Sequence, residues 1–175
     1  MPFTFLLGGA RSGKSALAVR LAVSSDRPVE FVATAEPRDD EMAERIRRHR
    51  AARQASWTTR EVPQAVADAI DEVAPKACVV FDCLSLWVSN RMEAGATDEE
   101  IVEECRAVAR MLAGREGPAV VISNEVGLGI VPTNALARRY RDVLGRVNAV
   151  FVDGAARAFL VVAGRALPLE EPTIA

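Results

Sequence analysis

A glycine-rich stretch near the N-terminus has the residue types and spacing for phosphate chemistry. It reads GGARSGKS and comprises Gly8, Gly9, Ala10, Arg11, Ser12, Gly13, Lys14 and Ser15. The spacing G-x-x-x-x-G-K-S is that of a P-loop, whose glycines let backbone N–H groups turn inward around phosphates. We expect Lys14 to reach the β- and γ-phosphates and the Ser15 hydroxyl to ligate Mg²⁺. A chance glycine-rich turn is the alternative.

The context of the stretch favours the P-loop. An apolar run at residues 3–7 precedes it, and residues 16–22 follow with the pattern of a helix. A strand before the loop and a helix after it are the setting in which the helix N-terminus adds donors and positive potential for a phosphate.

His49 is the only histidine of the chain and lies in an arginine-rich stretch. Residues 39–53 are expected to form a helix, with acids at its start and arginines towards its end. His49 shares a face with Met42, Ile46 and Arg53. It is either packed and inert beside these neighbours or a nucleophile among phosphate-pairing guanidinium groups. The flanking arginines are Arg47, Arg48, Arg50 and Arg53, and the residues alone leave both interpretations open.

Further candidate residues follow predicted strands. The apolar run from Ala77 ends at Asp82, in the position of the aspartate that P-loop proteins use to hold the Mg²⁺ shell. A helix cap is the simpler alternative for this residue. Glu61 lies in a short segment, 56–62, that is either a strand or extended chain, and it could be a surface acid. The loop Asn124–Pro132 contains two glycines and follows another apolar run, where functional loops are common.

Composition excludes several classes of protein. The 175 residues fit one domain, residues 1–175, half of whose residues are hydrophobic. A net charge of −2 gives no sign of nucleic-acid binding, and no apolar stretch is long enough to span a membrane. Three cysteines without metal-type spacing do not suggest a disulfide framework. Since the first strand leaves no room for a signal peptide, we expect a cytoplasmic protein.

Alternation of strand and helix patterns predicts an α/β fold with a mainly parallel sheet flanked by helices. Strands are expected at 3–7, 29–33, 77–82, 118–123 and 158–163, with an edge strand near 166–169. Helices are expected from near Lys14 to 22, and at 39–53, 63–73 (with Pro63 in its first turn), 83–92, 97–114 and from 133 onward. The last of these carries an apolar stripe from Leu136 to Phe151.

Four stretches together resemble one family. They are GGARSGKS at 8–15, DDEMAERIRRHR at 39–50, NEVGLGIVP at 124–132 and LARRYRDVLGRVN at 136–148. The chain resembles the bifunctional adenosylcobinamide kinase/adenosylcobinamide-phosphate guanylyltransferases of cobalamin biosynthesis over nearly its whole length. The resemblance implies a RecA-like P-loop NTPase core and a homotrimer.

The resemblance also implies two reactions. A nucleoside triphosphate, ATP or GTP, phosphorylates adenosylcobinamide, and GTP then transfers GMP to adenosylcobinamide phosphate through a guanylylated histidine, giving adenosyl-GDP-cobinamide. The family's histidine falls on His49, so that the catalytic residues would be His49 and Lys14. The implied nucleotide contacts are Gly8–Ser15, Ala33, Thr34, Ala35, Arg50, Ala51, Ala52, Arg53, Glu61 and Asp82, and the implied Mg²⁺ ligands are Ser15 and Asp82.

Two other functions remain open. A P-loop kinase of another small alcohol would need no nucleophilic histidine. A GTP-dependent regulatory switch is the second alternative, but such proteins usually carry an N-K-x-D loop, and this sequence contains none.

Overall fold

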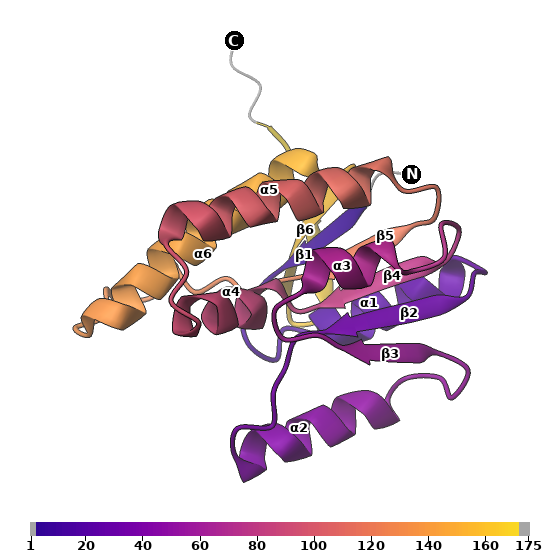
Figure 1. Cartoon of the computed structure of the whole chain (residues 1–175), viewed down its shortest axis with the longest axis horizontal. Helices are drawn as coiled ribbons and strands as arrows, with labels where there is room; N and C mark the ends of the chain where they lie inside the picture. The colour runs from indigo at the N-terminus through magenta and orange to yellow at the C-terminus, as the bar shows by residue number, and fades with distance from the viewer. Residues whose placement is uncertain (1–2, 172–175) are drawn as a thin grey trace.

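The computed structural model describes residues 3–171, which contain one seven-stranded sheet in the order β3-β2-β4-β5-β1-β6-β7 (Figure 1). The strands are β1 (Thr4–Leu7), β2 (Val29–Ala33), β3 (Thr58–Glu61), β4 (Cys78–Asp82), β5 (Ala119–Ile122), β6 (Arg157–Val162) and β7 (Arg165–Pro168). The helices are α1 (Lys14–Ser24), α2 (Asp40–Ala51), α3 (Val66–Asp71), α4 (Leu84–Glu93), α5 (Asp98–Gly114) and α6 (Ala135–Gly154).

Each pairing between neighbouring strands is parallel except β6–β7, the antiparallel hairpin that forms one edge. The expected α/β fold with a mainly parallel sheet is therefore confirmed. Strand β5 lies between β1 and β4. The segments that follow β1, β4 and β5 consequently leave the sheet at the same edge, where ligands of open α/β sheets bind.

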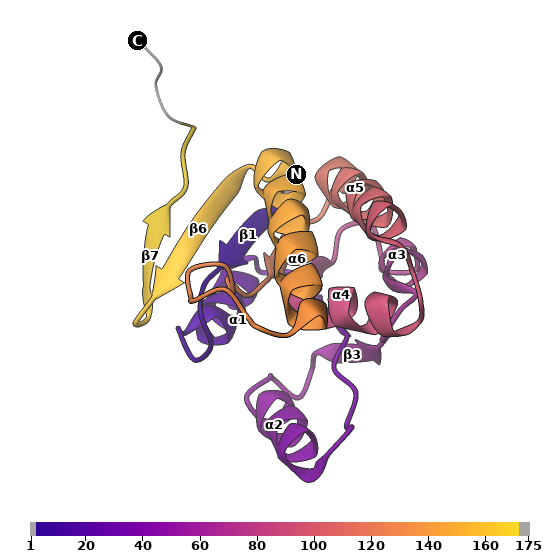
Figure 2. The same ribbon diagram turned by 90° about the vertical axis from the view of Figure 1, so that its left-hand side faces the viewer.

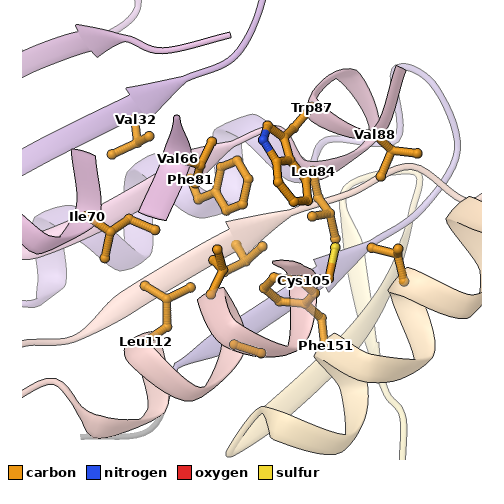
Figure 3. Close-up of a cluster of buried hydrophobic side chains, with 14 of the residues drawn as sticks. Val32, Val66, Ile70, Phe81, Leu84, Trp87, Val88, Cys105, Leu112 and Phe151 are labelled. Carbon is orange, nitrogen blue, oxygen red and sulfur yellow. The ribbon is translucent and has the colours of Figure 1, made fainter. Parts of the chain in front are cut away.

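The helices cover the two faces of the sheet unequally. Helices α3, α4, α5 and α6 pack on one face around a large apolar core, part of which Figure 3 shows. Trp87, Phe81 and Phe151 are among its largest fully buried side chains. Cys105 is also buried there, and Cys78 and Cys83 are buried on the opposite face, as expected for small apolar side chains.

The opposite face is covered mainly by α1, whose Ala18 and Ala22 pack on β1, β4 and β5. Helix α2 lies apart from both layers, beyond the edge strand β3 (Figures 1 and 2). None of its twelve residues, all of which the structure describes, is buried. The elements that would hold a phosphate belong to the core, whereas the helix that carries His49 does not.

Most expected elements occur where the sequence places them. The capping box of Thr97 and Glu100 begins α5, Trp87 is buried, and the uncertain segment at 56–62 forms β3. Among the described residues no helix is long and apolar enough to cross a membrane. The ends of the expected domain, residues 1 and 175, lie outside the described range.

Two expectations about helix starts were wrong. The helix expected from Pro63 begins only at Val66, because Val62 continues the β3 pairing through its N–H to Ala33 O and Asn90 binds the Pro63 carbonyl. The last helix begins at Ala135, capped by Asn134. Leu136, expected on its buried stripe, is 63% exposed because the first turn of α6 extends past the core.

Candidate active site

Residues 8–15 form the loop between β1 and α1, as a P-loop requires. Gly13 adopts a left-handed conformation with φ of 101°, which turns the chain into the helix and favours glycine. Helix α1 begins at Lys14 without a side-chain cap. Its first N–H groups therefore remain as donors for an anion.

The Lys14 side chain is folded onto the loop itself. Its Nζ donates to Gly8 O and Gly9 O, each at 2.7 Å, and to Ser12 Oγ at 3.3 Å. Burial lowers the pKa of Lys14, and the nearby Asp82 carboxylate opposes that effect. The ammonium is thus placed where phosphate oxygens could replace loop carbonyls as its acceptors.

Asp82, the last residue of β4, lies opposite the loop. Its carboxylate is 14% exposed, with Oδ2 at 3.8 Å from His49 Nδ1 and 3.7 Å from an Arg53 nitrogen. Both distances are within ion-pair range and longer than a hydrogen bond. Asp82 is not a helix cap, because Cys83 occupies the N-cap position of α4.

The charge pattern of α2 explains both its helical structure and its exposure. The Asp39 side chain caps it by accepting from Met42 N at 2.7 Å, acids occupy its first turn and Arg48, His49 and Arg50 its last. Met42, Ile46 and His49 share a face, as expected, and that face points towards the site. His49 is 38% exposed, so it is not a packed core histidine.

A cleft of about 520 Å³ brings the loop and this helix together. Asp82 and Asn124 complete its wall at the carboxyl ends of β4 and β5. The residues that line it are Ala10, Arg11, Ser12, Gly13, Lys14, Ser15, Ala16, Glu41, Arg45, Arg48, His49, Asp82, Cys83, Ile122 and Asn124. Residues distant in the sequence therefore form one arginine-rich space that is large enough for several phosphate groups.

The arginines of α2, together with Arg53 just after it, divide into separate groups. Arg45 and Arg48 line the cleft, Arg50 pairs with Glu61 at 2.5 Å, and Arg53 stacks on the Phe31 ring at 4.1 Å. Burial lowers the pKa of Arg53, against the opposite effect of Asp82. Arg47 pairs with Glu44 and is exposed, so it does not belong to the cluster around His49 in which the sequence placed it.

A smaller hollow adjoins the cleft and contains several of the expected nucleotide contacts. Ala33, Ala35, Arg50, Arg53, Glu61 and Asp82 line it with His49. Thr34 is fully buried, and its side chain is committed to the Cys83 backbone, donating to O at 2.7 Å and accepting from N at 3.0 Å. Ala51 is exposed and lines neither space, whereas Ala52 lines an adjoining apolar cavity.

The expected Mg²⁺ ligands suit a magnesium ion in type, and both line the cleft. Ser15 and Asp82 line the same cleft and offer oxygen atoms, which Mg²⁺ prefers, and it usually takes its other ligands from water and phosphate. Among residues 3–171, no group of three or more His, Cys, Asp or Glu side chains is arranged to hold a metal. A cation here would therefore depend on the bound nucleotide for much of its coordination.

Sequence reasoning missed two residues of the site. Arg45 precedes His49 by four positions, and this spacing alone places both side chains on one helix face. Asn90 donates to Thr34 O and Pro63 O at 2.9 Å each and so fixes the loop after β2. No sequence signal marks Asn90, because its role depends on segments far apart in the chain.

The sequence matches a family described as cobinamide kinase/cobinamide phosphate guanyltransferase over residues 4–169. The chain belongs to this family. It is 40% identical to the bifunctional adenosylcobalamin biosynthesis protein CobP of Pseudomonas aeruginosa over 94% of this chain and 95% of that protein. The CobU protein of the same description from Salmonella typhimurium is 37% identical, over 90% and 93% of the two chains. Membership confirms the expected bifunctional enzyme of cobalamin biosynthesis.

A solved structure of another protein supports the fold described above. The crystal structure of the RadB recombinase superposes with a TM-score of 0.53 over 91% of this chain and 73% of that one, at 14% identity. At this identity the likeness concerns the fold alone, and it confirms the RecA-like P-loop NTPase core.

Proposed function

We propose that this enzyme phosphorylates adenosylcobinamide with ATP or GTP and then transfers GMP to the phosphate through a covalent guanylyl-His49. The observation that carries the proposal is the cleft in which Lys14, Ser15, Asp82 and His49 face one space. A kinase of another small alcohol would need the loop, but not a partly exposed histidine aimed at it.

The position of His49 supports its role as the nucleophile. With the Asp82 carboxylate on the Nδ1 side at 3.8 Å, the tautomer protonated at Nδ1 is favoured and Nε2 carries the lone pair. Attack of Nε2 on the α-phosphorus of GTP forms a P–N bond as the bond to pyrophosphate breaks. A phosphate oxygen of adenosylcobinamide phosphate then attacks the same phosphorus and releases His49.

Cationic side chains would stabilise the charge that develops in both steps. Arg45 and Arg48 lie on the same helix as His49 and line the cleft. Guanidinium groups suit phosphate oxygens because they donate in a rigid planar fork. A Mg²⁺ ion held by Ser15 and Asp82 would neutralise further phosphate charge when bound.

Phosphorylation of adenosylcobinamide would use the loop side of the cleft. When a triphosphate enters, Lys14 exchanges the carbonyls of Gly8 and Gly9 for β- and γ-phosphate oxygens, and the loop N–H groups bind the remaining oxygens. In phosphoryl transfer the protein contributes mainly position and charge neutralisation, which these groups supply.

We also propose that Glu61 recognises the guanine base during guanylyl transfer. The Watson–Crick edge of guanine presents N–H donors, and a carboxylate accepts from two of them at once. Glu61 lines the smaller hollow next to His49 and is held by Arg50 at 2.5 Å. That ion pair would have to open, or shift with α2, to admit the base.

The corrinoid would approach from the loop after β5. Leu128 is 85% exposed and Ile130 97%, and the loop starts at Asn124 inside the cleft. An apolar surface next to the reacting phosphate suits the large macrocycle of adenosylcobinamide.

Labelling with GTP tests the nucleophile. Incubation with α-³²P-GTP and Mg²⁺ should label the protein with an acid-labile, alkali-stable bond, and His49→Ala should abolish the label while retaining phosphorylation of adenosylcobinamide. Arg47→Ala is the matched control, because this exposed side chain on the same helix pairs with Glu44. Label that persists in His49→Ala would contradict the assignment, and wild-type protein without any label would favour the monofunctional kinase.

We further propose that the enzyme is a homotrimer, as the family resemblance implies, and that it is cytoplasmic, as expected from the sequence. Light scattering of the purified protein should give three times the chain mass of 18.8 kDa. A monomer would disprove the assembly.

Slow GTP hydrolysis with no turnover on adenosylcobinamide would instead favour a regulatory switch.

A further inference from the structure

An apolar cavity of about 340 Å³ lies beside the phosphate cleft and has no assigned role. Carbon atoms make up most of its wall, contributed by Ala16 and Val19 of α1, Phe31 of β2, Ala52 after α2, and Ile122 of β5. Arg53 closes one side, with its guanidinium stacked on Phe31, which in turn stacks on Trp57 with ring centroids 5.5 Å apart. An apolar site of this volume suits an aromatic ring system.

The cavity continues directly from the phosphate cleft. Ser15, Ala16, His49, Asp82 and Ile122 line both spaces. In a P-loop the β- and γ-phosphates lie towards the lysine, and the α-phosphate lies towards the start of the helix. A triphosphate held by Lys14 and the loop N–H groups would therefore direct its ribose and base past Ala16 along α1.

This cavity differs from the hollow that contains Glu61. The Glu61 hollow offers a carboxylate for a guanine edge, whereas the apolar cavity has no carboxylate other than Asp82 at its phosphate end. His49 lines both. The two spaces therefore give two positions for a base, on either side of one nucleophile, the Glu61 hollow only after its ion pair with Arg50 has opened or shifted.

We infer that the apolar cavity beside α1 binds the purine base of the phosphoryl donor, separately from the Glu61 hollow that binds guanine for guanylyl transfer. For the Glu61 hollow, but not for the apolar cavity, this inference rests on the proposed function. The base position determines which phosphorus meets which nucleophile. With the base beside Val19 the γ-phosphate is presented to an alcohol, and with the base at Glu61 the α-phosphate is presented to His49.

Substitutions that fill the cavity test the inference through nucleotide binding, without a measurement of activity. Val19→Phe places a ring in the cavity, and Val23→Phe makes the same change one turn further along α1, where Val23 is 50% exposed and outside the cavity. Equilibrium binding is measured with AMP-PNP and with inorganic tripolyphosphate, which has no base. Val19→Phe should weaken AMP-PNP binding by about tenfold or more and leave tripolyphosphate binding within about twofold, and Val23→Phe should change neither. Ala52→Leu fills the cavity from the opposite wall and should repeat the result.

The outcomes separate the inference from the proposed function. Unchanged AMP-PNP binding in both cavity variants, or an equal loss of AMP-PNP and tripolyphosphate in both, would overturn the inference. An equal loss of AMP-PNP binding and of His49 labelling by α-³²P-GTP in Val19→Phe would show one shared base site and also overturn it. If wild-type protein failed to phosphorylate adenosylcobinamide, the proposed function would fail while the binding comparison stayed valid.

Discussion

Gly8 shows how closely one residue of the loop is constrained. A Cβ atom at this position would lie 2.3 Å from the Val161 carbonyl oxygen of β6, whereas one at Gly9 would meet nothing within 4 Å. The first glycine is therefore required by the neighbouring strand, even before any nucleotide binds.

Substitution of the two glycines should separate these roles. Gly8→Ala should lower the free energy of unfolding by about 1–3 kcal/mol, because backbone atoms must move to remove the clash. Gly9→Ala should change it by less than about 0.5 kcal/mol. Urea unfolding of both variants measures the difference, and equal stabilities would contradict the packing argument.

At the scale of elements, α6 is connected to α4 by a tyrosine. The Tyr140 hydroxyl donates to Ser85 O of α4 at 3.1 Å, and burial raises its pKa to about 12. Ser85 Oγ in turn accepts from Asn124 Nδ2 at 2.9 Å, at the edge of the cleft. The contact thus links the packing of two helices to a residue of the site.

The Tyr140 hydroxyl should make stability depend on alkaline pH. Its pKa is higher in the folded protein than the ordinary value of 10. Its contribution to the free energy of unfolding is therefore complete below pH 10 and decreases as pH rises towards 12. At pH 8, Tyr140→Phe should be about 1 kcal/mol less stable than wild type, because it lacks the hydrogen bond. By about pH 11.5 Tyr140→Phe should be the more stable of the two proteins, since each pH unit above 10 lowers the free energy of unfolding of the wild type by about 1.4 kcal/mol. Urea unfolding at both pH values measures this, and a constant difference would disprove it.

Helix α2 is the element least restrained by the core. Its charged composition leaves all twelve described residues at least partly exposed, and it is attached through ion pairs of Arg50 and Arg53 at its C-terminal end. The Arg50–Glu61 pair is about half exposed and contributes little to stability, whereas the Arg53 side chain, just after the helix, is only 8% exposed and anchors that end. None of the helix is buried in the core, so it can move without unfolding the sheet. Such a movement is one way for a single site to serve attack at two different phosphorus atoms.

At the scale of the whole molecule, nucleotide binding should stabilise the fold. A ligand at about 100 times its Kd adds about 2.7 kcal/mol to the free energy of unfolding. For a chain of this size that raises Tm by about 5–10 °C. Thermal unfolding with Mg²⁺ and AMP-PNP should show this rise in the wild type and lose most of it in Lys14→Ala, which should also lower both activities.

The other lysine provides the control for this measurement. Lys76 is exposed and precedes β4, at the end of the strand opposite Asp82. Lys76→Ala should keep the full ligand-induced rise in Tm. A similar loss in both variants would mean that general charge, and not the loop lysine, governs the binding.

The sequence by itself determined the parallel α/β fold and the loop. It marked His49 for attention, but only the resemblance of four stretches to one family made this residue the candidate nucleophile. Strand and helix periodicity, the G-x-x-x-x-G-K-S spacing and a single histidine among arginines are local signals, readable without knowledge of contacts. Element ends were less predictable: α3 starts at Val66 because Asn90 and Ala33 hold the preceding residues, and Leu136 is exposed because α6 extends past the core.

Only the tertiary structure decided which candidates share a site. The order of β1, β5 and β4 brings Lys14 and Asp82 to one edge, and the turn after β2 sets α2 so that Arg45 and His49 face that edge while Arg47 faces solvent. Thr34, a plausible contact by sequence, is instead tied to Cys83. These outcomes depend on contacts between residues far apart in the chain, such as Thr34 with Cys83 and, across β1 and β5, Thr4 with Val120. Local patterns carry no information about such contacts.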